Sequence, residues 1–245
     1  MEIIGDTIKM FEFHELSEIA SRDFSQHLDL NQILVVLIRI KGFAKDLMQF
    51  ERYLTNRENE RYKAYQTKSR AQQFIIHRGI LRLLCARCLA QPKTAIHFAE
   101  TAYHKPFIKS QINQIDLRFN LSHSQNHAIY AFALKREIGI DIEATNNRSV
   151  DLSGAESVLA PSELGELYTL PSSNRIISFL KLWTQKEAIS KALGLGLALN
   201  FKDIVLGFEQ NKYSKVKIMG ETIGVHDISQ YNEYVAALAV EMPNV

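Results

Sequence analysis

The 245-residue chain contains little cysteine, proline or tryptophan, with two, five and one residues respectively. Cys85 and Cys88 lie three residues apart in a segment with a helical pattern, and the sequence has no second cysteine pair to complete a zinc site. We expect both thiols to be buried packing residues, because free cysteine behaves mostly as a small hydrophobe. Unpaired cysteines also fit a reducing compartment, so we expect a cytoplasmic protein.

An excess of charge and long hydrophobic runs are missing as well. The chain has 29 basic and 27 acidic residues, a formal net charge of +2, which gives no reason to expect a nucleic-acid partner. The longest apolar run, residues 33–38, is too short to cross a bilayer. Residues 1–10 lack the basic region and apolar core of a secretory signal. We therefore expect no membrane partner either.

The order of predicted elements repeats along the chain. A dense apolar strand at 32–40 follows a polar stretch that we expect to be irregular; helices and then short strands come after it. The same order returns from the strand at 138–143 onward, with a further strand predicted at 204–208. The repetition predicts an α+β fold of two similar α/β halves, 1–136 and 137–245, with a ligand cleft where they meet.

The strand at 138–143, Ile-Gly-Ile-Asp-Ile-Glu, places two carboxylates on one face. A period of two puts Asp141 and Glu143 together and the three isoleucines on the opposite face. Paired acids are suited to metal binding. Alone, the pattern favours an ordinary half-buried strand with a polar outer face over a metal site.

A long helix, predicted to end near residue 192, contributes a third carboxylate. Glu187 and Lys191 are four residues apart and project from one face, which alone indicates only a helix-stabilising ion pair. Combined with Asp141 and Glu143, they supply three acids and one cation. This set suits Mg²⁺ and a pyrophosphate group, since Mg²⁺ prefers oxygen ligands and a lysine can hold phosphate oxygens.

Two other polar features have an open interpretation. A predicted helix from residue 69 carries Arg70, Arg78, Arg82 and Arg87 on its polar side, which is either a solvated face or an anion-binding surface. His123, beside a predicted strand, is in isolation more typical of a core or surface histidine than of a functional one.

Four motifs, in this order, resemble the Sfp-type 4′-phosphopantetheinyl transferases. They are Tyr103-His104-Lys105-Pro106, Phe119-Asn120-Leu121-Ser122-His123-Ser124, the strand at 138–143, and the segment from Trp183 to Lys191. With the arginine-rich helix, the likeness covers about residues 55–210. The resemblance implies a monomer of two pseudo-twofold-related α/β halves, with the active site at their interface.

The resemblance also implies an activity. Family members transfer 4′-phosphopantetheine from coenzyme A to a serine hydroxyl of an apo acyl- or peptidyl-carrier protein, with Mg²⁺, and release adenosine 3′,5′-bisphosphate. By this resemblance Asp141, Glu143 and Glu187 are metal ligands, and Glu187, Lys191 and His123 are catalytic. The implied coenzyme A contacts are Arg70, Arg78, Lys105, Pro106, Ser122, His123, Asp141, Glu187 and Lys191.

Some details of the resemblance leave alternatives. Glu187 is the preferred general base, with a metal-bound water as the alternative. His104 stands where the family usually has glycine, so a side-chain-bearing residue must tolerate any unusual backbone angle there. The apolar candidates for carrier contact are Val150, Leu152, Val158 and Leu159.

Two other functions would use the same residues. A Mg²⁺-dependent hydrolase of coenzyme A or a related dinucleotide needs the acids but no carrier protein. A catalytically silent carrier-protein binder needs the carrier but not the acids or the lysine, so the presence of all three acids and the lysine argues against it.

Overall fold

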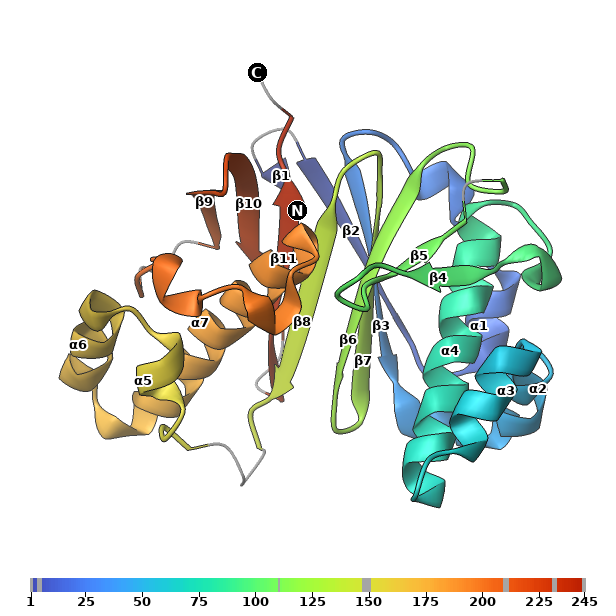
Figure 1. Ribbon diagram of the computed structural model, residues 1–245, viewed down its shortest axis with the longest axis horizontal. Helices are drawn as coiled ribbons and strands as arrows, with labels where there is room; N and C mark the ends of the chain where they lie inside the picture. Colours follow the sequence, from blue (N-terminus) through green and yellow to red (C-terminus); the bar gives the residue numbers. More distant parts are fainter. Residues whose placement is uncertain are drawn as a thin grey trace. The chain divides into compact units, whose positions relative to one another are not determined.

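Two structural units, each formed by several stretches of the chain, are present in the computed structural model (Figure 1). The structure describes residues 2–3, 6–109, 111–146, 151–208, 212–230 and 233–243. The first unit comprises residues 1–99, 106–117 and 126–135, and the second comprises 100–105, 118–125 and 136–245. The sequence predicted one break, after residue 136; in the structure, two short segments that precede this point belong to the second unit.

A five-stranded sheet has the order β1-β2-β3-β7-β6. Its strands are β1 (Glu2–Ile3), β2 (Asp6–Phe13), β3 (Gln32–Arg39), β6 (Leu117–Ser124) and β7 (His127–Leu134). β3 is parallel to β2 and antiparallel to β7. The strand predicted at 32–40 is confirmed as β3, and its side chains from Ile33 to Ile38 are buried. The N-terminal stretch predicted to be irregular instead forms β2.

Helices accompany this sheet in the first unit. They are α1 (Leu16–Ser21), α2 (Leu47–Glu51), α3 (Asn56–Lys63) and α4 (Lys68–Cys88). The start of α3 is capped, since the side chains of Thr55 and Glu58 each accept a hydrogen bond from the other's backbone N–H. Within the unit α4 lies alongside the sheet (Figure 1), and its buried His77 is 3.3 Å from the hydroxyl of Tyr130 on β7. Cys85 and Cys88 are free and buried, as expected.

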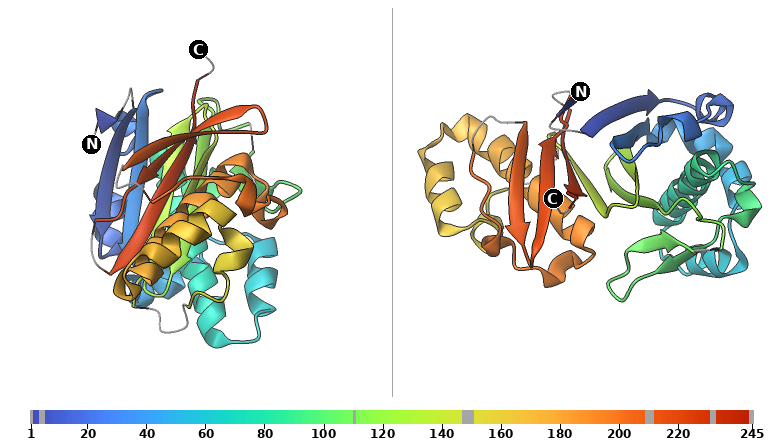
Figure 2. Two further views of the ribbon diagram at one scale, coloured as in Figure 1. Left: turned by 90° about the vertical axis from the view of Figure 1, so that its left-hand side faces the viewer. Right: turned by 90° about the horizontal axis from the view of Figure 1, so that it is seen from above.

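The second unit is built on an antiparallel sheet with the order β8-β11-β10-β9. Its strands are β8 (Ile138–Ala144), β9 (Tyr213–Ile218), β10 (Glu221–Asp227) and β11 (Tyr234–Glu241). The helices α5 (Ala155–Val158), α6 (Pro161–Thr169) and α7 (Ser172–Leu193) lie together on one side of this sheet, as both views of Figure 2 show in yellow and orange beside the red strands. Side chains of α7, β10 and β11 share one apolar core.

The long helix α7 ends where the sequence predicted. Gly194 adopts the left-handed conformation, with φ of 72°. The backbone N–H groups of Gly194 and Leu195 donate to Lys191 and Ser190, respectively, which satisfies carbonyl groups of the last turn. The strand predicted at 204–208 does not form.

Two short strands, β4 (Phe98–Glu100) and β5 (Pro106–Ile108), form a separate ribbon. The α+β prediction is thus confirmed by mixed sheets and helices in both units. Within the described residues, no helix is both long and apolar enough to span a bilayer.

Candidate active site

Asp141 and Glu143 lie on the face of β8 that α7 covers. The geometry follows from Gly139, because a Cβ atom there would be 2.0 Å from the carbonyl oxygen of Ala188 and 2.4 Å from the backbone nitrogen of Ala192. Only glycine permits the helix to approach the strand this closely. Asp141 is 3% exposed. The strand is therefore buried on both faces, and the alternative of a half-buried strand with a polar outer face is wrong.

Lys191 is the cation at the centre of this site. Its Nζ is 2.6 Å from Oδ1 of Asp141 and 3.2 Å from Oγ of Ser122. The predicted pairing with Glu187, one helical turn earlier, is present at 4.0 Å. Helix α7 and strands β6 and β8 thus bring Asp141, Glu187, Lys191 and Ser122 together, all within the second unit.

Two serines of β6 bind the two acids of β8. Ser122 donates a hydrogen bond to Asp141 at 2.7 Å, and Ser124 donates one to Glu143 at 2.8 Å. His123, between them, points to the other face of its strand by the alternation of side chains, and it is exposed. Partial desolvation and then the charge of Lys191 lower the pKa of His123, which favours its neutral form.

The three carboxylates influence one another electrostatically. Burial raises the pKa of Glu143, and the charge of Asp141 adds to this effect while Ser124 opposes it. Burial also raises the pKa of Glu187; Lys191 opposes this, and the charges of Asp141 and Glu143 add to it. Three acids therefore share one nearby ammonium group.

These residues fit a divalent cation in composition. Oδ2 of Asp141 is buried and has no hydrogen-bond partner among the described residues. A buried carboxylate oxygen with no donor is costly, and a metal ion would satisfy it. In the described part of the chain no three Asp, Glu, His or Cys side chains converge as a formed metal cluster. Lys191 binds Asp141, and Ser124 binds Glu143.

Lys105 lies at the C-terminal end of α7. Its ammonium donates to Oε2 of Glu137 at 2.6 Å and to the carbonyl oxygen of Ala192 at 2.9 Å. Arg118 binds the other oxygen of Glu137 at 2.6 Å. Burial lowers the pKa of Lys105, and Glu137 opposes this shift. Lys105 is therefore held beside Ala192, the residue after Lys191, and its present ion-pair partner is Glu137.

His104, before Lys105, has a φ of 63°, in the left-handed region that favours glycine. This agrees with the expectation that a side-chain-bearing residue tolerates an unusual angle here. The side chain is 85% exposed, and its Nδ1 is 3.3 Å from Glu100. The strained turn is thus part of the second unit and immediately precedes a predicted nucleotide contact.

The remaining predicted coenzyme A contacts, Arg70, Arg78 and Pro106, belong to the first unit. Arg70 is exposed near the start of α4. Arg78 is mostly buried, with its Nε 3.4 Å from Glu58, and its guanidinium lies over the rings of Phe74 and Phe98. Arg82 is 1% exposed and binds both carboxylate oxygens of Glu58. The arginine helix is therefore not a uniform solvated face.

The expected carrier contacts are mostly core residues. Val158 and Leu159 are 5% and 1% exposed, and Leu152 packs against the same core. Val150 lies outside the described residues. Since buried side chains offer no docking surface, Val158 and Leu159 are wrong as carrier contacts.

A buried ion pair next to Glu187 was not predicted from the sequence. The ammonium of Lys186 binds Glu163 at 2.5 Å and the carbonyl oxygens of Val158 and Phe201 at 3.1 and 3.0 Å. Glu163 also accepts hydrogen bonds from the backbone of Ala160 and of Leu206. The position of Lys186 among inward-facing residues of the helix indicates that its side chain is buried. Its partner Glu163 is distant in sequence, so the pairing itself could not be predicted.

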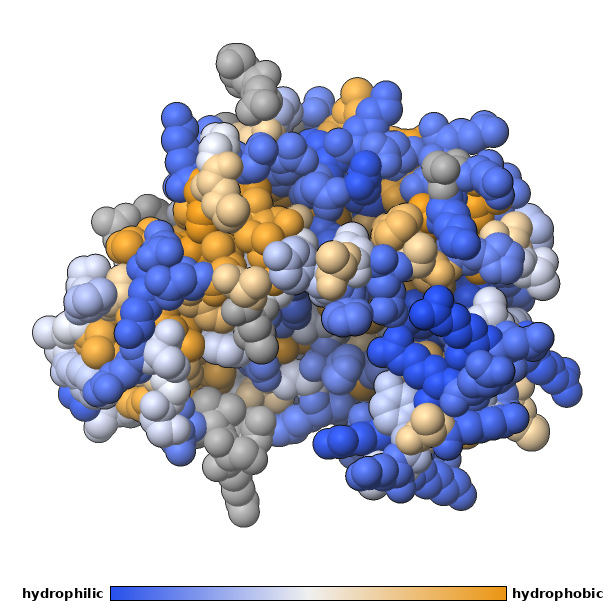
Figure 3. All heavy atoms as spheres, in the orientation of Figure 1, coloured by the Kyte–Doolittle hydropathy of each residue, from blue (hydrophilic) through white to orange (hydrophobic). Residues whose placement is uncertain are grey.

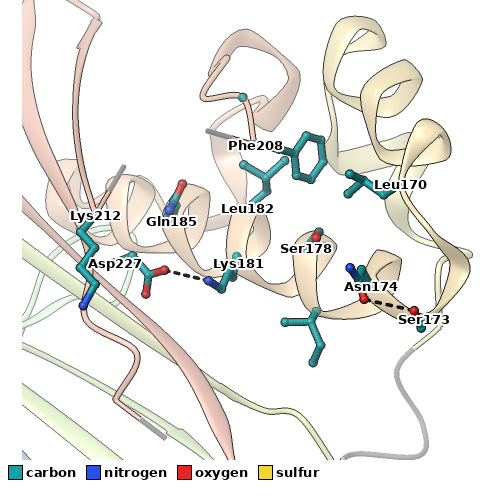
Figure 4. A pocket seen from close by; sticks show the side chains of 12 residues that line it. Leu170, Ser173, Asn174, Ser178, Lys181, Leu182, Gln185, Phe208, Lys212 and Asp227 are labelled. Atoms are coloured by element: carbon teal, nitrogen blue, oxygen red, sulfur yellow. Dashed lines mark hydrogen bonds and ion pairs between the residues drawn. The ribbon is translucent and has the colours of Figure 1, made fainter. Parts of the chain in front are cut away.

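A separate hollow of about 530 Å³ lies along the N-terminal half of α7 (Figure 4). Leu170, Leu182 and Phe208 form its apolar wall, and Lys181 and Asp227 form an ion pair at 3.2 Å on its polar side. None of the predicted site residues lines it.

Hydrophobic side chains also reach the surface of the second unit near β9 and β10 (Figure 3).

Asp141, Glu187, Lys191 and Ser122 thus lie close together in an α+β chain, and a lysine beside acids of this kind is suited to phosphate groups. The family model described as the 4′-phosphopantetheinyl transferase superfamily matches residues 137–239. The model described as the N-terminal part of 4′-phosphopantetheinyl transferase matches residues 41–134. The chain belongs to the 4′-phosphopantetheinyl transferase superfamily, and it is an enzyme of this class.

Individual relatives agree with the family match. The chain is 34% identical to the 4′-phosphopantetheinyl transferase HetI of Nostoc sp., over 59% of this chain and 61% of HetI. It is 26% identical to the 4′-phosphopantetheinyl transferase Sfp of Bacillus subtilis, over 69% of this chain and 73% of Sfp. The predicted Sfp-type resemblance is thereby confirmed, although the match spans less than two thirds of HetI.

Among solved structures, the holo-[acyl-carrier-protein] synthase of Thermotoga maritima matches 44% of this chain and 64% of its own, with 22% identity and a TM-score of 0.30.

Proposed function

We propose that the chain transfers the 4′-phosphopantetheinyl group of coenzyme A to a serine hydroxyl of an apo acyl- or peptidyl-carrier protein in a Mg²⁺-dependent reaction. The observation that supports this most directly is the convergence of Asp141, Glu187, Lys191 and Ser122, with one oxygen of Asp141 buried and without a donor among the described residues. Acids of this kind are suited to a cation, and a lysine beside them to phosphate oxygens.

The reaction breaks the pyrophosphate link of coenzyme A. The serine oxygen of the carrier forms a bond to the phosphorus of the phosphopantetheinyl group, and the bond from that phosphorus to the oxygen of adenosine 3′,5′-bisphosphate breaks. The serine proton passes to a base, and the leaving bisphosphate takes the bonding electrons. Charge therefore grows on the leaving oxygen, where positive charge lowers the barrier.

Asp141, Glu143 and Glu187 would hold Mg²⁺, which when bound neutralises charge on the pyrophosphate. Lys191 would hold pyrophosphate oxygens, for which it would exchange its present contact with Asp141. A neutral His123 would donate a hydrogen bond to a phosphate oxygen rather than add a charge.

Glu187 is the proposed general base. Its side chain is 16% exposed, so it is not sealed from solvent. Burial raises its pKa, and a carboxylate with a raised pKa is the stronger proton acceptor. Removal of such a base commonly lowers the rate by about 10²–10⁴-fold.

The contacts to the nucleotide are also part of the proposal. Lys105 and Pro106 would line the nucleotide side with Ser122, and Arg78 or Arg70 would bind its 3′-phosphate. For Lys105 this requires release from Glu137, its present partner. We further propose that the protein acts in the cytoplasm as a monomer, because one chain supplies both family segments and both cysteines are free.

The decisive experiment measures the intact mass of apo carrier proteins after incubation with enzyme, coenzyme A and Mg²⁺. The expected result is the addition of one phosphopantetheinyl group, with its loss when Mg²⁺ is chelated or when Glu187 is replaced in a folded Glu187→Gln variant. Bisphosphate release at the same rate without a carrier would indicate a hydrolase instead. Carrier binding with no change in mass would indicate a silent binder.

A further inference from the structure

The strand that carries two of the proposed metal ligands, β8, is the first strand in the order of its sheet, so one edge of its backbone is not paired within that sheet. Three polar side chains of β6 lie against this strand: Asn120, Ser122 and Ser124. They occupy alternate positions and therefore project from the same face of β6. β6 thus meets β8 through side chains.

Two of these side chains bind backbone groups of β8. Oδ1 of Asn120 accepts a hydrogen bond from the N–H of Ile140 at 3.0 Å, and Oγ of Ser124 accepts one from the N–H of Ala144 at 3.1 Å. Ile140 and Ala144 are fully or almost fully buried. A buried N–H without an acceptor costs about 1–3 kcal/mol, so these contacts fix the strand on both sides of its acidic pair.

Ser124 has a second role through its hydroxyl proton. A serine hydroxyl has one proton to donate, and that of Ser124 goes to Oε2 of Glu143 at 2.8 Å. The side chain is 8% exposed, so water does not readily replace either contact. Ser124 therefore links the backbone of Ala144 to the carboxylate of Glu143 and restricts the direction in which that carboxylate points.

We infer that Asn120 and Ser124 are positioning residues of the active site. Asn120 fixes the backbone before Asp141, and Ser124 fixes the backbone after Glu143 together with the Glu143 carboxylate. Both residues act through their contacts with β8. Groups that orient metal ligands from outside the ligand shell typically affect metal affinity by about 10–100-fold. The inference rests on the proposed function, since it requires Glu143 to bind a cation.

The test measures Mn²⁺ binding by electron paramagnetic resonance in the presence of saturating coenzyme A and without a carrier, so that no transfer occurs. Ser124→Ala should weaken Mn²⁺ binding by about 10–100-fold. Ser124→Thr, which keeps the hydroxyl, should bind as the wild type does. Ser21→Ala is the matched control, because Ser21 is exposed and its hydroxyl donates to the carbonyl of Glu18 in its own helix.

A double-mutant cycle tests whether Ser124 acts through Glu143. In the Glu143→Gln background, Ser124→Ala should cause little further loss of Mn²⁺ affinity. Equal losses in both backgrounds would overturn the assignment of Ser124 as the residue that orients Glu143. Should Ser124→Ala not fold at the assay temperature, Ser124→Cys, whose thiol is a weak donor and acceptor, replaces it and should show a partial loss.

Asn120 is tested in the same assay with Asn120→Leu, which removes the acceptor, and Asn120→Asp, which keeps one. Asn120→Leu should weaken Mn²⁺ binding and Asn120→Asp should retain more of it. If the wild type binds Mn²⁺ and transfers the group, and folded Ser124→Ala and Asn120→Leu bind Mn²⁺ with unchanged affinity, this inference alone is refuted. Absence of Mn²⁺ binding by the wild type would refute the proposed metal site and this inference together.

Discussion

Replacement of Lys186 by methionine should destabilise the second unit strongly. Lys186 and Glu163 have side chains only 0% and 1% exposed, and the ammonium uses all three protons on Glu163 and two backbone carbonyl groups. Lys186→Met keeps most of the chain length but leaves Glu163 as a buried carboxylate without its cation. Removing one partner of a buried pair costs about 3–5 kcal/mol.

This loss is large compared with the whole stability of a typical folded protein, about 5–15 kcal/mol. In a chain of this size, 1 kcal/mol shifts the melting temperature by about 2–4 °C, so the expected shift is about 6–20 °C. Urea unfolding can be followed by the fluorescence of Trp183, the single tryptophan, which lies on α7 three residues before Lys186.

Lys181→Met provides the matched control on the same helix. Lys181 is 46% exposed and forms a surface ion pair with Asp227, so its replacement should cost at most about 1 kcal/mol. If both variants lost the same small amount of stability, the assignment of Lys186 as a buried structural cation would be refuted.

Three further predictions concern the site and the turn before it. Because burial raises the pKa of Glu187, the stability that this residue contributes is fully present below its unfolded pKa of about 4.5 and is lost as pH rises through the higher folded pKa. In Mg²⁺-free buffer, Glu187→Gln should therefore have a higher melting temperature than the wild type at neutral pH, and the difference should disappear in acid. A difference that does not change with pH would contradict this. Gly139→Ala places a Cβ 2.0 Å from a backbone oxygen of α7, so it should lower the free energy of unfolding in urea by about 1–3 kcal/mol or more and should also lower transfer activity. Unchanged stability and activity would show that the helix moves freely. His104→Gly removes the strain of a side-chain-bearing residue in the left-handed region and should raise the free energy of unfolding by up to about 1 kcal/mol, reduced by the larger conformational entropy of glycine in the unfolded chain. His104→Ala, which keeps a Cβ, should not raise it.

Several features of the site could be predicted because they depend on local periodicity. The alternation of β8 places Asp141 and Glu143 on one face, and the helical repeat places Glu187 near Lys191. The closer partner of Lys191 is Asp141, however, and that contact depends on how α7 packs on β8. The signal for the packing was Gly139, whose role becomes visible only when the facing helix backbone is known.

Other elements depend on partners that are distant in sequence. The polarity of the β2 segment predicted an irregular stretch. Its polar and apolar residues alternate, however, and parallel pairing with β3 stabilises it as a strand. The stretch at 204–208 has the apolar composition of a strand, yet the N–H of Leu206 binds the carboxylate of Glu163 and the N–H of Ile204 binds Phe201. These N–H groups are therefore not available to a sheet.

The side-chain contacts along β8 also bear on solubility. An apolar strand at the edge of a sheet presents unpaired N–H and C=O groups, and another chain can add to it and start aggregation. The isoleucines of β8 make it such a strand, but Asn120 and Ser124 occupy the N–H groups of Ile140 and Ala144. The polar residues of β6 therefore protect the chain against self-association at the same strand where they arrange its acids.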